Sequence, residues 1–110
     1  MNGKSEHRYT VVTGRIPLGA STYDRWGVIV AIVGPDYTVF PICTEPSERE
    51  QINSFEINEL DEGFHPTGLK HTSYVLDKAT VFRDIQVLEV AGELTGKIKE
   101  RFKRWLGLTE

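Results

Sequence analysis

The chain has 110 residues, of which 39% are hydrophobic and 26% are charged, and a net charge of −3 at pH 7. This size and composition predict one globular domain, residues 1–110, with a single core. A membrane span is not expected, because no apolar run approaches roughly 18 residues, and residues 1–10 are too polar for a secretory signal. The only cysteine, Cys43, excludes an internal disulfide and favours a cytoplasmic location. No histidine or cysteine spacing matches a metal site, so neither a metal nor another cofactor is expected.

Charge is distributed unevenly along the chain. Residues 95–110 contain five basic and two acidic side chains, a net +3, and since the whole chain carries −3, residues 1–94 carry −6. Residues 45–62 hold seven acidic side chains and one basic side chain, Arg49. Such a chain can meet a polyanion on one side and a basic partner on the other. The simpler interpretation is a solvated helix face and an acidic loop.

The first strand-like residues follow a polar start. Residues 1–8 are expected to be flexible. Residues 9–12 and 14–18 are typical of two short strands, and Pro17 indicates an edge position because proline cannot donate to a sheet ladder. Residues 19–24 are small and polar and predict a loop.

The strongest predicted strand covers residues 26–33. These residues are almost all apolar or β-branched, so burial on both faces is expected. The following Gly34-Pro35-Asp36 predicts a tight turn, after which residues 37–42 return antiparallel to the first strand. Residues 45–53 are expected to form a charged loop or a short helix.

Shorter elements follow in the second half of the chain. Residues 55–57 alternate like a brief strand, and residues 58–71 are rich in turn-forming glycine and proline. Three more short strands are predicted at residues 73–76, 80–82 and 87–90.

The carboxyl-terminal residues predict a helix. Thr95 is a favourable N-cap, and Gly107 lies where a C′ glycine belongs. Between them one apolar stripe recurs at helical spacing: Ile98, Phe102, Trp105 and Leu106. A helix with such a stripe must pack on the sheet. The expected fold is therefore mainly β with a C-terminal α-helix, arranged as a small, partly open β-barrel.

A series of short patterns occurs along the chain in one order. They are Gly14-Arg15-Ile16, Arg25, Pro41-Ile42-Cys43-Thr44, Phe55-Glu56-Ile57, Gly68-Leu69-Lys70, Ser73-Tyr74-Val75-Leu76-Asp77 and Gly92-Glu93-Leu94-Thr95. Their order resembles the MazF/PemK family of toxin endoribonucleases over roughly residues 14–108. The resemblance implies an SH3-like barrel of the CcdB/MazF type, a homodimer and a cognate antitoxin protein as a partner.

The resemblance also implies cleavage of single-stranded RNA without a metal, by attack of a ribose 2′-hydroxyl on the adjacent phosphate. This chemistry needs a base, an acid and a cation for the developing phosphate charge. The family pattern assigns the cation to Arg25, a hydrogen bond to Thr44 beside Cys43, and proton transfer or orientation to Asp77. It also places Ser73 in contact with RNA, together with Cys43, which with Thr44 occupies the family's pair of hydroxyl residues.

Residue chemistry adds further candidates for the same site. His71 lies two positions before Ser73 and is a second candidate for proton transfer, so the general base stays open between His71 and Asp77. Trp26 and Tyr74 are candidates for stacking on bases. The candidates also have structural alternatives. Arg25 could simply end a strand, Asp77 could belong to a turn, and Trp26 and Tyr74 could be core aromatic residues.

The chain departs from the family pattern at several positions that bear on activity and base specificity. Trp26 replaces a proline, Arg15 an acidic residue, Cys43 a hydroxyl residue and Val75 a residue that is basic in many members, and the loop before Arg25 is shortened. One alternative is therefore a catalytically degenerate barrel that binds RNA or protein. Another is a gyrase poison like the CcdB toxins, to which Trp105 near the chain end has a loose likeness. The last is a structural SH3-like module.

Overall fold

The computed structural model describes residues 8–17, 24–83 and 88–109. The expectations of flexibility at residues 1–8, of a loop at 19–24 and of a strand beginning at residue 87 fall wholly or partly outside the described residues. The elements are β1 (Thr10–Arg15), β2 (Asp24–Val33), β3 (Asp36–Cys43), α2 (Glu48–Ile52), β4 (Phe55–Ile57), the 3₁₀-helix η1 (His65–Thr67), β5 (Ser73–Val75), β6 (Thr80–Phe82), β7 (Glu89–Glu93) and α3 (Gly96–Thr109).

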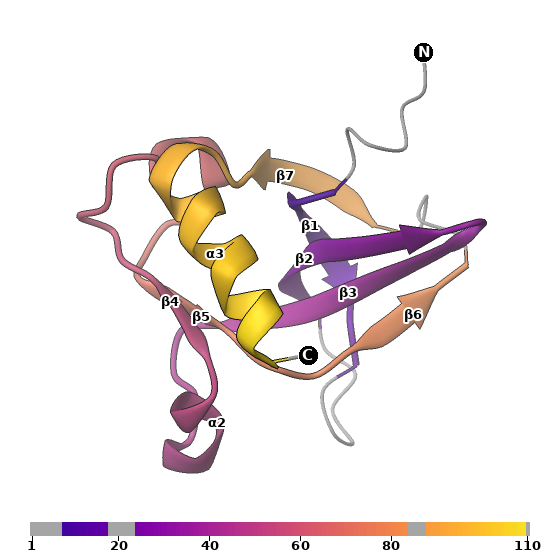
Figure 1. The fold of residues 1–110 in the computed structure, drawn as a ribbon, viewed down its shortest axis with the longest axis horizontal. Coiled ribbons are helices and arrows are strands. Elements are labelled where there is room, and N and C mark those ends of the chain that lie inside the picture. Colours follow the sequence, from indigo (N-terminus) through magenta and orange to yellow (C-terminus); the bar gives the residue numbers. More distant parts are fainter. Residues whose placement is uncertain (1–7, 18–23, 84–87, 110) are drawn as a thin grey trace.

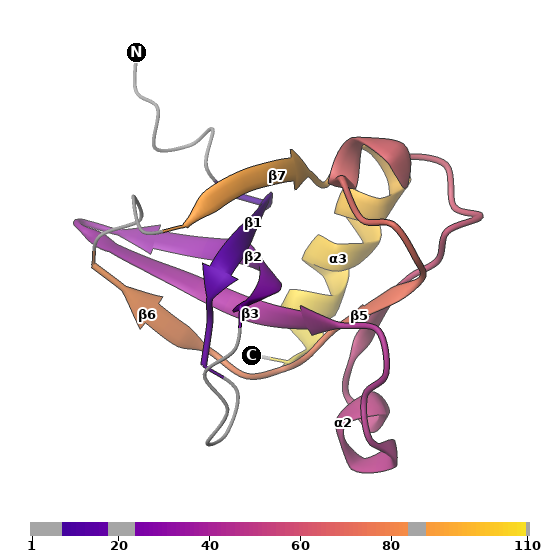
Figure 2. The ribbon, with the colours of Figure 1, turned by 180° about the vertical axis from the view of Figure 1, so that it is seen from behind.

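The described strands form one curled antiparallel sheet. Its order is β4-β5-β3-β2-β1-β7, and β6 pairs with β3 outside this path. Two opposite views show the sheet curving around the interior, with α3 lying along one side (Figures 1 and 2). This arrangement confirms the predicted fold, which is mainly β, a small open barrel with a C-terminal helix.

The core lies between α3 and the concave face of the sheet. The apolar stripe of α3 is confirmed: Ile98, Phe102 and Leu106 are buried, and Trp105 packs against them. The Phe102 ring contacts the Phe55 ring, with centroids 5.2 Å apart. Aromatic side chains dominate the energetics of such cores because each buries a large apolar area.

The ends of α3 differ from the prediction in one respect. Thr95 immediately precedes the helix as expected, and its carbonyl accepts a hydrogen bond from the Lys99 amide at 3.2 Å. The predicted stop at Gly107 is wrong, because α3 continues to Thr109. Glycine permits the left-handed conformation that ends many helices but does not impose it. The glycine with positive φ lies instead at the start, where Gly96 has φ +56°.

The β2–β3 hairpin confirms the predicted turn. Gly34 has φ +60°, the conformation that a two-residue hairpin turn requires of its first residue. Burial of β2 on both faces is confirmed only at its centre, where Val28 packs into the main core and Ile29 into a second cluster on the opposite face. Val33 is 71% exposed. A strand of ten residues spans about 33 Å, close to the 35 Å length of the molecule, so its end extends past the core.

Three boundaries also differ from the sequence-based expectation. The two strands expected in residues 9–18 form a single strand, β1, with an irregularity against β7 between Val11 and Val12. β1 lies between β2 and β7, so Pro17 marks the residues after the strand rather than a sheet edge. β7 extends to Glu93, three residues beyond its predicted end. Of the two alternatives for residues 45–53, the helix forms, because Ser47 and Glu50 make a reciprocal capping box at the start of α2.

Two glycines allow the backbones of η1 and β7 to cross in close contact. A Cβ on Gly92 would overlap the backbone carbonyls of Pro66 and Thr67, and a Cβ on Gly68 would overlap the carbonyl of Ala91. Gly68 also has φ +79°, a value that disfavours other residues. Glycine at both positions therefore has a packing reason. The crossing fixes the start of the segment that leads to β5.

Candidate functional site

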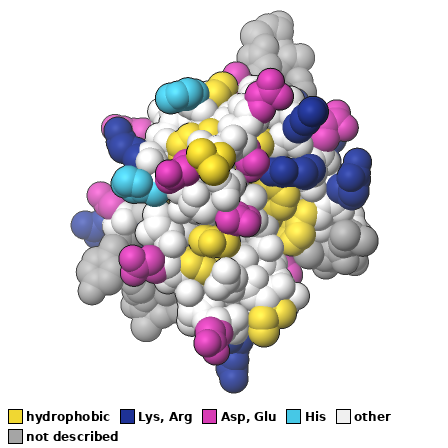
Figure 3. Space-filling model, turned by 90° about the vertical axis from the view of Figure 1, so that its left-hand side faces the viewer, with side chains coloured by type: hydrophobic (Ala, Val, Ile, Leu, Met, Phe, Trp, Pro, Cys, Tyr) yellow, Lys and Arg dark blue, Asp and Glu magenta, His cyan; other side chains and the backbone are white. Residues whose placement is uncertain are grey.

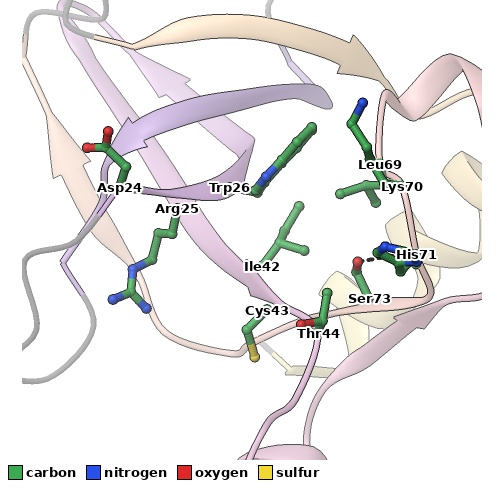
Figure 4. A pocket seen from close by; sticks show the side chains of 10 residues that line it. All are labelled: Asp24, Arg25, Trp26, Ile42, Cys43, Thr44, Leu69, Lys70, His71 and Ser73. Carbon is green, nitrogen blue, oxygen red and sulfur yellow. Dashed lines mark hydrogen bonds between the residues drawn. The ribbon is translucent and has the colours of Figure 1, made fainter.

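A cavity of about 540 Å³ opens at one end of the barrel. It is lined by Asp24, Arg25, Trp26, Ile42, Cys43, Thr44, Leu69, Lys70, His71 and Ser73 (Figure 4). Three segments contribute: the start of β2, the end of β3 with the next residue, and the segment from Leu69 to the first residue of β5. This volume lies within the range of about 300–1,000 Å³ typical of small-molecule sites.

Strand pairing brings two of these segments together. In the antiparallel register Trp26 lies opposite Ile42, so the first residues of β2 adjoin the last residues of β3. Ile42 in turn lies opposite Val75 in β5. The third segment arrives after Gly68, whose left-handed conformation ends η1 and turns the chain toward the cavity. Residues far apart in sequence therefore meet at one end of the sheet.

The cavity contains six of the predicted site residues: Arg25, Trp26, Cys43, Thr44, His71 and Ser73. Tyr74, the next residue of β5, does not line it. Asp77 also lies elsewhere. It lines a separate hollow of about 110 Å³ with residues that include Arg49 and Lys78.

The cavity wall is apolar in its middle and has one cationic side chain at each end, with Asp24 beside Arg25. The side chains of Trp26, Ile42 and Leu69 form the apolar part. In Figure 4 the Trp26 ring lies between Arg25 and Lys70, whose side chains are directed away from each other. Lys70 stands in the Gly68-Leu69-Lys70 pattern, but sequence reasoning assigned it no role. Its place in the cavity depends on the left-handed conformation of Gly68, which turns the chain there.

A hydrogen bond within the loop fixes the hydroxyl of Ser73. The Ser73 Oγ donates to the backbone carbonyl of His71 at 2.8 Å, and Ser73 is only 2% exposed. A serine hydroxyl has one proton to donate and two lone pairs that accept. Because the hydroxyl proton is donated to the backbone carbonyl of His71, the Ser73 oxygen can act toward a ligand only as an acceptor.

The thiol of Cys43, which lines the cavity, interacts electrostatically with the Glu50 carboxylate of α2. Burial raises the pKa of the Cys43 thiol above its usual value, and the nearby Glu50 carboxylate raises it further, whereas the Glu45 backbone amide and Arg25 act in the opposite direction. Hydrogen bonds from Ser47 lower the pKa of Glu50, and the charges of Lys78 and Arg25 lower it further. Cys43 therefore stays a protonated thiol near neutral pH, which does not suit a nucleophile.

The reactivity of this thiol provides a direct test of the arrangement. Because the folded-state pKa of Cys43 is raised, alkylation by iodoacetamide is expected to be slow at pH 8 and to accelerate at higher pH than in the unfolded chain. Glu50→Gln removes a charge that disfavours the thiolate, so its rate-against-pH curve should shift to lower pH. Glu48→Gln, an exposed position in the same helix, is the matched control. Identical curves for Glu50→Gln and the unaltered chain would contradict this coupling.

The described residues contain neither a cluster of metal ligands nor a helix that could cross a membrane. No cluster of three or more histidine, cysteine, aspartate or glutamate side chains suited to a metal ion occurs among them. None of the helices found in those residues has the length and apolar character needed to cross a membrane.

Comparison with known protein-family models and with curated protein sequences found no match to this chain.

Proposed function

We propose that this chain is an endoribonuclease of the toxin type, which cleaves single-stranded RNA by attack of a ribose 2′-hydroxyl on the adjacent phosphate, without a metal. The observation that supports this most is the meeting of Arg25, Thr44 and His71 in one cavity. These residues come from three different segments and supply a cation, a hydroxyl donor and an acid–base group. Those are the groups that this reaction requires.

Arg25 has the position and chemistry to stabilise the transition state. A guanidinium stays charged at any working pH, and its planar fork matches two phosphate oxygens. Arg25 is half-buried at the cavity, where electrostatic interactions are stronger than in bulk water. In the proposed reaction it binds the phosphate as negative charge develops, and the Thr44 hydroxyl adds a hydrogen bond.

The placement of the two proton-transfer candidates favours His71. His71 lines the cavity with Arg25, whereas Asp77 lies in the hollow beside α2. We expect His71→Ala to lower the single-turnover cleavage rate by about 10²–10⁴-fold, the usual contribution of a general acid or base. Asp77→Asn, which removes a charge outside the cavity, should leave the rate nearly unchanged. The reverse pattern would assign proton transfer to Asp77.

The charge of the surface makes one segment, residues 45–62, unsuited to RNA. Acidic side chains are scattered over the face shown in Figure 3, and most of the basic ones lie toward its margins. The exposed acidic residues of the 45–62 segment would repel phosphate: Glu45, Glu48, Glu56, Glu59 and Glu62. This segment is better suited to protein contacts. The resemblance further leads us to include in the proposal a cognate antitoxin protein and a homodimer, and the single cysteine a cytoplasmic site of action.

The alternative of a gyrase poison depended on Trp105. Trp105 is half-buried, and its ring centroid lies 6.0 Å from that of Phe40 and 5.5 Å from that of Phe102. The side chain thus serves the core, which disfavours the gyrase alternative.

The proposal is tested by comparing an RNA oligonucleotide with its 2′-O-methyl counterpart of the same sequence. The RNA should be cut into products with 5′-hydroxyl and 2′,3′-cyclic phosphate ends, because the attacking group is the 2′-hydroxyl. The methylated strand should bind and stay intact. Cleavage of the methylated strand would contradict the proposed chemistry, and binding of both strands without cleavage would favour a non-catalytic RNA-binding barrel.

A further inference from the structure

Two cationic side chains line the cavity, although the proposed reaction uses only one of them to bind the reacting phosphate. Arg25 comes from β2, and Lys70 comes from the loop after η1. We infer that the cavity binds one internal nucleotide of a strand through both of its phosphates, Arg25 binding one and Lys70 the other. The identity of the strand as RNA rests on the proposed function, but the inference concerns how the strand is held.

The directions of the two side chains support two separate phosphate sites. Figure 4 shows Arg25 and Lys70 extending away from each other on either side of the Trp26 ring. Cations directed apart in this way are not arranged to bind one anion. A nucleotide inside a strand presents one phosphate on its 5′ side and another on its 3′ side, so it offers a separate anion to each of the two cations.

The surroundings of Lys70 leave its ammonium available to a ligand. Lys70 is exposed, and it forms no salt bridge with any residue in the described parts of the chain. The one acidic residue of the cavity lining, Asp24, lies beside Arg25 and away from Lys70 (Figure 4), and its carboxylate is 3.8 Å from Arg15 Nε. A lysine side chain is a flexible point charge that binds phosphate readily.

The part of the cavity between the two cations suits a base. The apolar surfaces of Trp26, Ile42 and Leu69 lie there, and stacking on an aromatic ring contributes about 1–3 kcal/mol per base. The Ser73 oxygen, whose proton is donated to the His71 carbonyl, offers a fixed acceptor beside this surface. The arrangement therefore favours a base with an N–H group at the edge that meets Ser73.

Salt-dependent binding separates one phosphate site from two. The probe is a fluorescent 2′-O-methyl hexanucleotide, which binds without being cut, and its affinity is measured by anisotropy over a range of salt concentrations. For single strands, each phosphate contact contributes about 0.7 to the slope of log K against log salt. Arg25→Gln and Lys70→Gln should each reduce the slope by about 0.7, and the double variant by about 1.4. Lys97→Gln, an exposed position on α3, should leave the slope unchanged.

The binding of small nucleotides tests the same two phosphate sites without an RNA strand. A nucleoside 3′,5′-bisphosphate should lose affinity in both Arg25→Gln and Lys70→Gln, whereas a nucleoside 5′-monophosphate should lose affinity in only one of them. An unchanged salt slope in Lys70→Gln, or equal losses for the monophosphate in both variants, would overturn the inference. RNA cleavage together with an unchanged Lys70→Gln slope would contradict only the two-phosphate arrangement. The expected slopes without any RNA cleavage would contradict only the proposed enzyme.

Discussion

Arg25→Ala is expected to lower the rate of RNA cleavage by about 10²–10³-fold, the usual loss when one group that stabilises transition-state charge is removed. The reason is the place of Arg25 in the cavity, where its guanidinium can follow the phosphate into the transition state. The measurement is the single-turnover cleavage rate with saturating protein, because binding then does not limit the reaction.

Arg83→Ala provides the matched control for this variant. Arg83 is an exposed arginine whose Nε lies 3.5 Å from Asp36, and it does not line the cavity. Exposed ion pairs contribute about 1 kcal/mol or less, so Arg83→Ala should remain folded. Circular dichroism and the urea midpoint of both variants establish whether Arg25→Ala keeps the fold, and its rate is compared only in that state. Equal rates for Arg25→Ala and Arg83→Ala would remove Arg25 from the reaction.

Gly92→Ala is expected to destabilise the fold by about 3 kcal/mol or more. The added methyl group would overlap the carbonyls of Pro66 and Thr67, and relief requires the backbones of β7 and η1 to separate. Gly92 does not have a left-handed φ, so the expected loss comes from overlap alone. The loss should appear as a lower urea midpoint, because the linear dependence of stability on denaturant then gives the free-energy change.

Gly107→Ala is the control that separates this overlap from a general effect of adding a methyl group. No atom lies within 4 Å of a Cβ at Gly107, which is inside α3. Alanine in a helix is favoured over glycine by up to about 1 kcal/mol, so this variant should be slightly stabilised. A Gly92→Ala variant as stable as Gly107→Ala would mean that β7 and η1 do not cross as described.

The fold could be predicted from the sequence where the local signals agreed with tertiary packing. The apolar stripe from Ile98 to Leu106 predicted both the helix and the face that it buries. The Gly34-Pro35 turn predicted the central hairpin because positive φ has a specific residue preference. Boundaries were less accurate, since Gly107 is compatible with both a helix and its end, and the burial of Val33 depends on how far the core extends.

The candidates Arg25 and Thr44 came from the family resemblance, and their roles stay predictions. The structure shows only that they line one cavity, because the antiparallel pairing of β2 and β3 brings the start of one strand beside the end of the other. Lys70 was missed because its position depends on the crossing of η1 and β7, which no local pattern reports. The separation of Asp77 from the cavity likewise depends on where the chain turns after β5.

The measurement that tests the proposed function most directly is incubation of the purified protein with a long single-stranded RNA in EDTA, followed by sizing and end-group analysis. We expect discrete fragments with 5′-hydroxyl ends from the unaltered chain and intact RNA from Arg25→Ala. Intact RNA from the unaltered chain at high protein concentration, or equal cleavage by both proteins, would contradict the account of this cavity as the site of RNA cleavage.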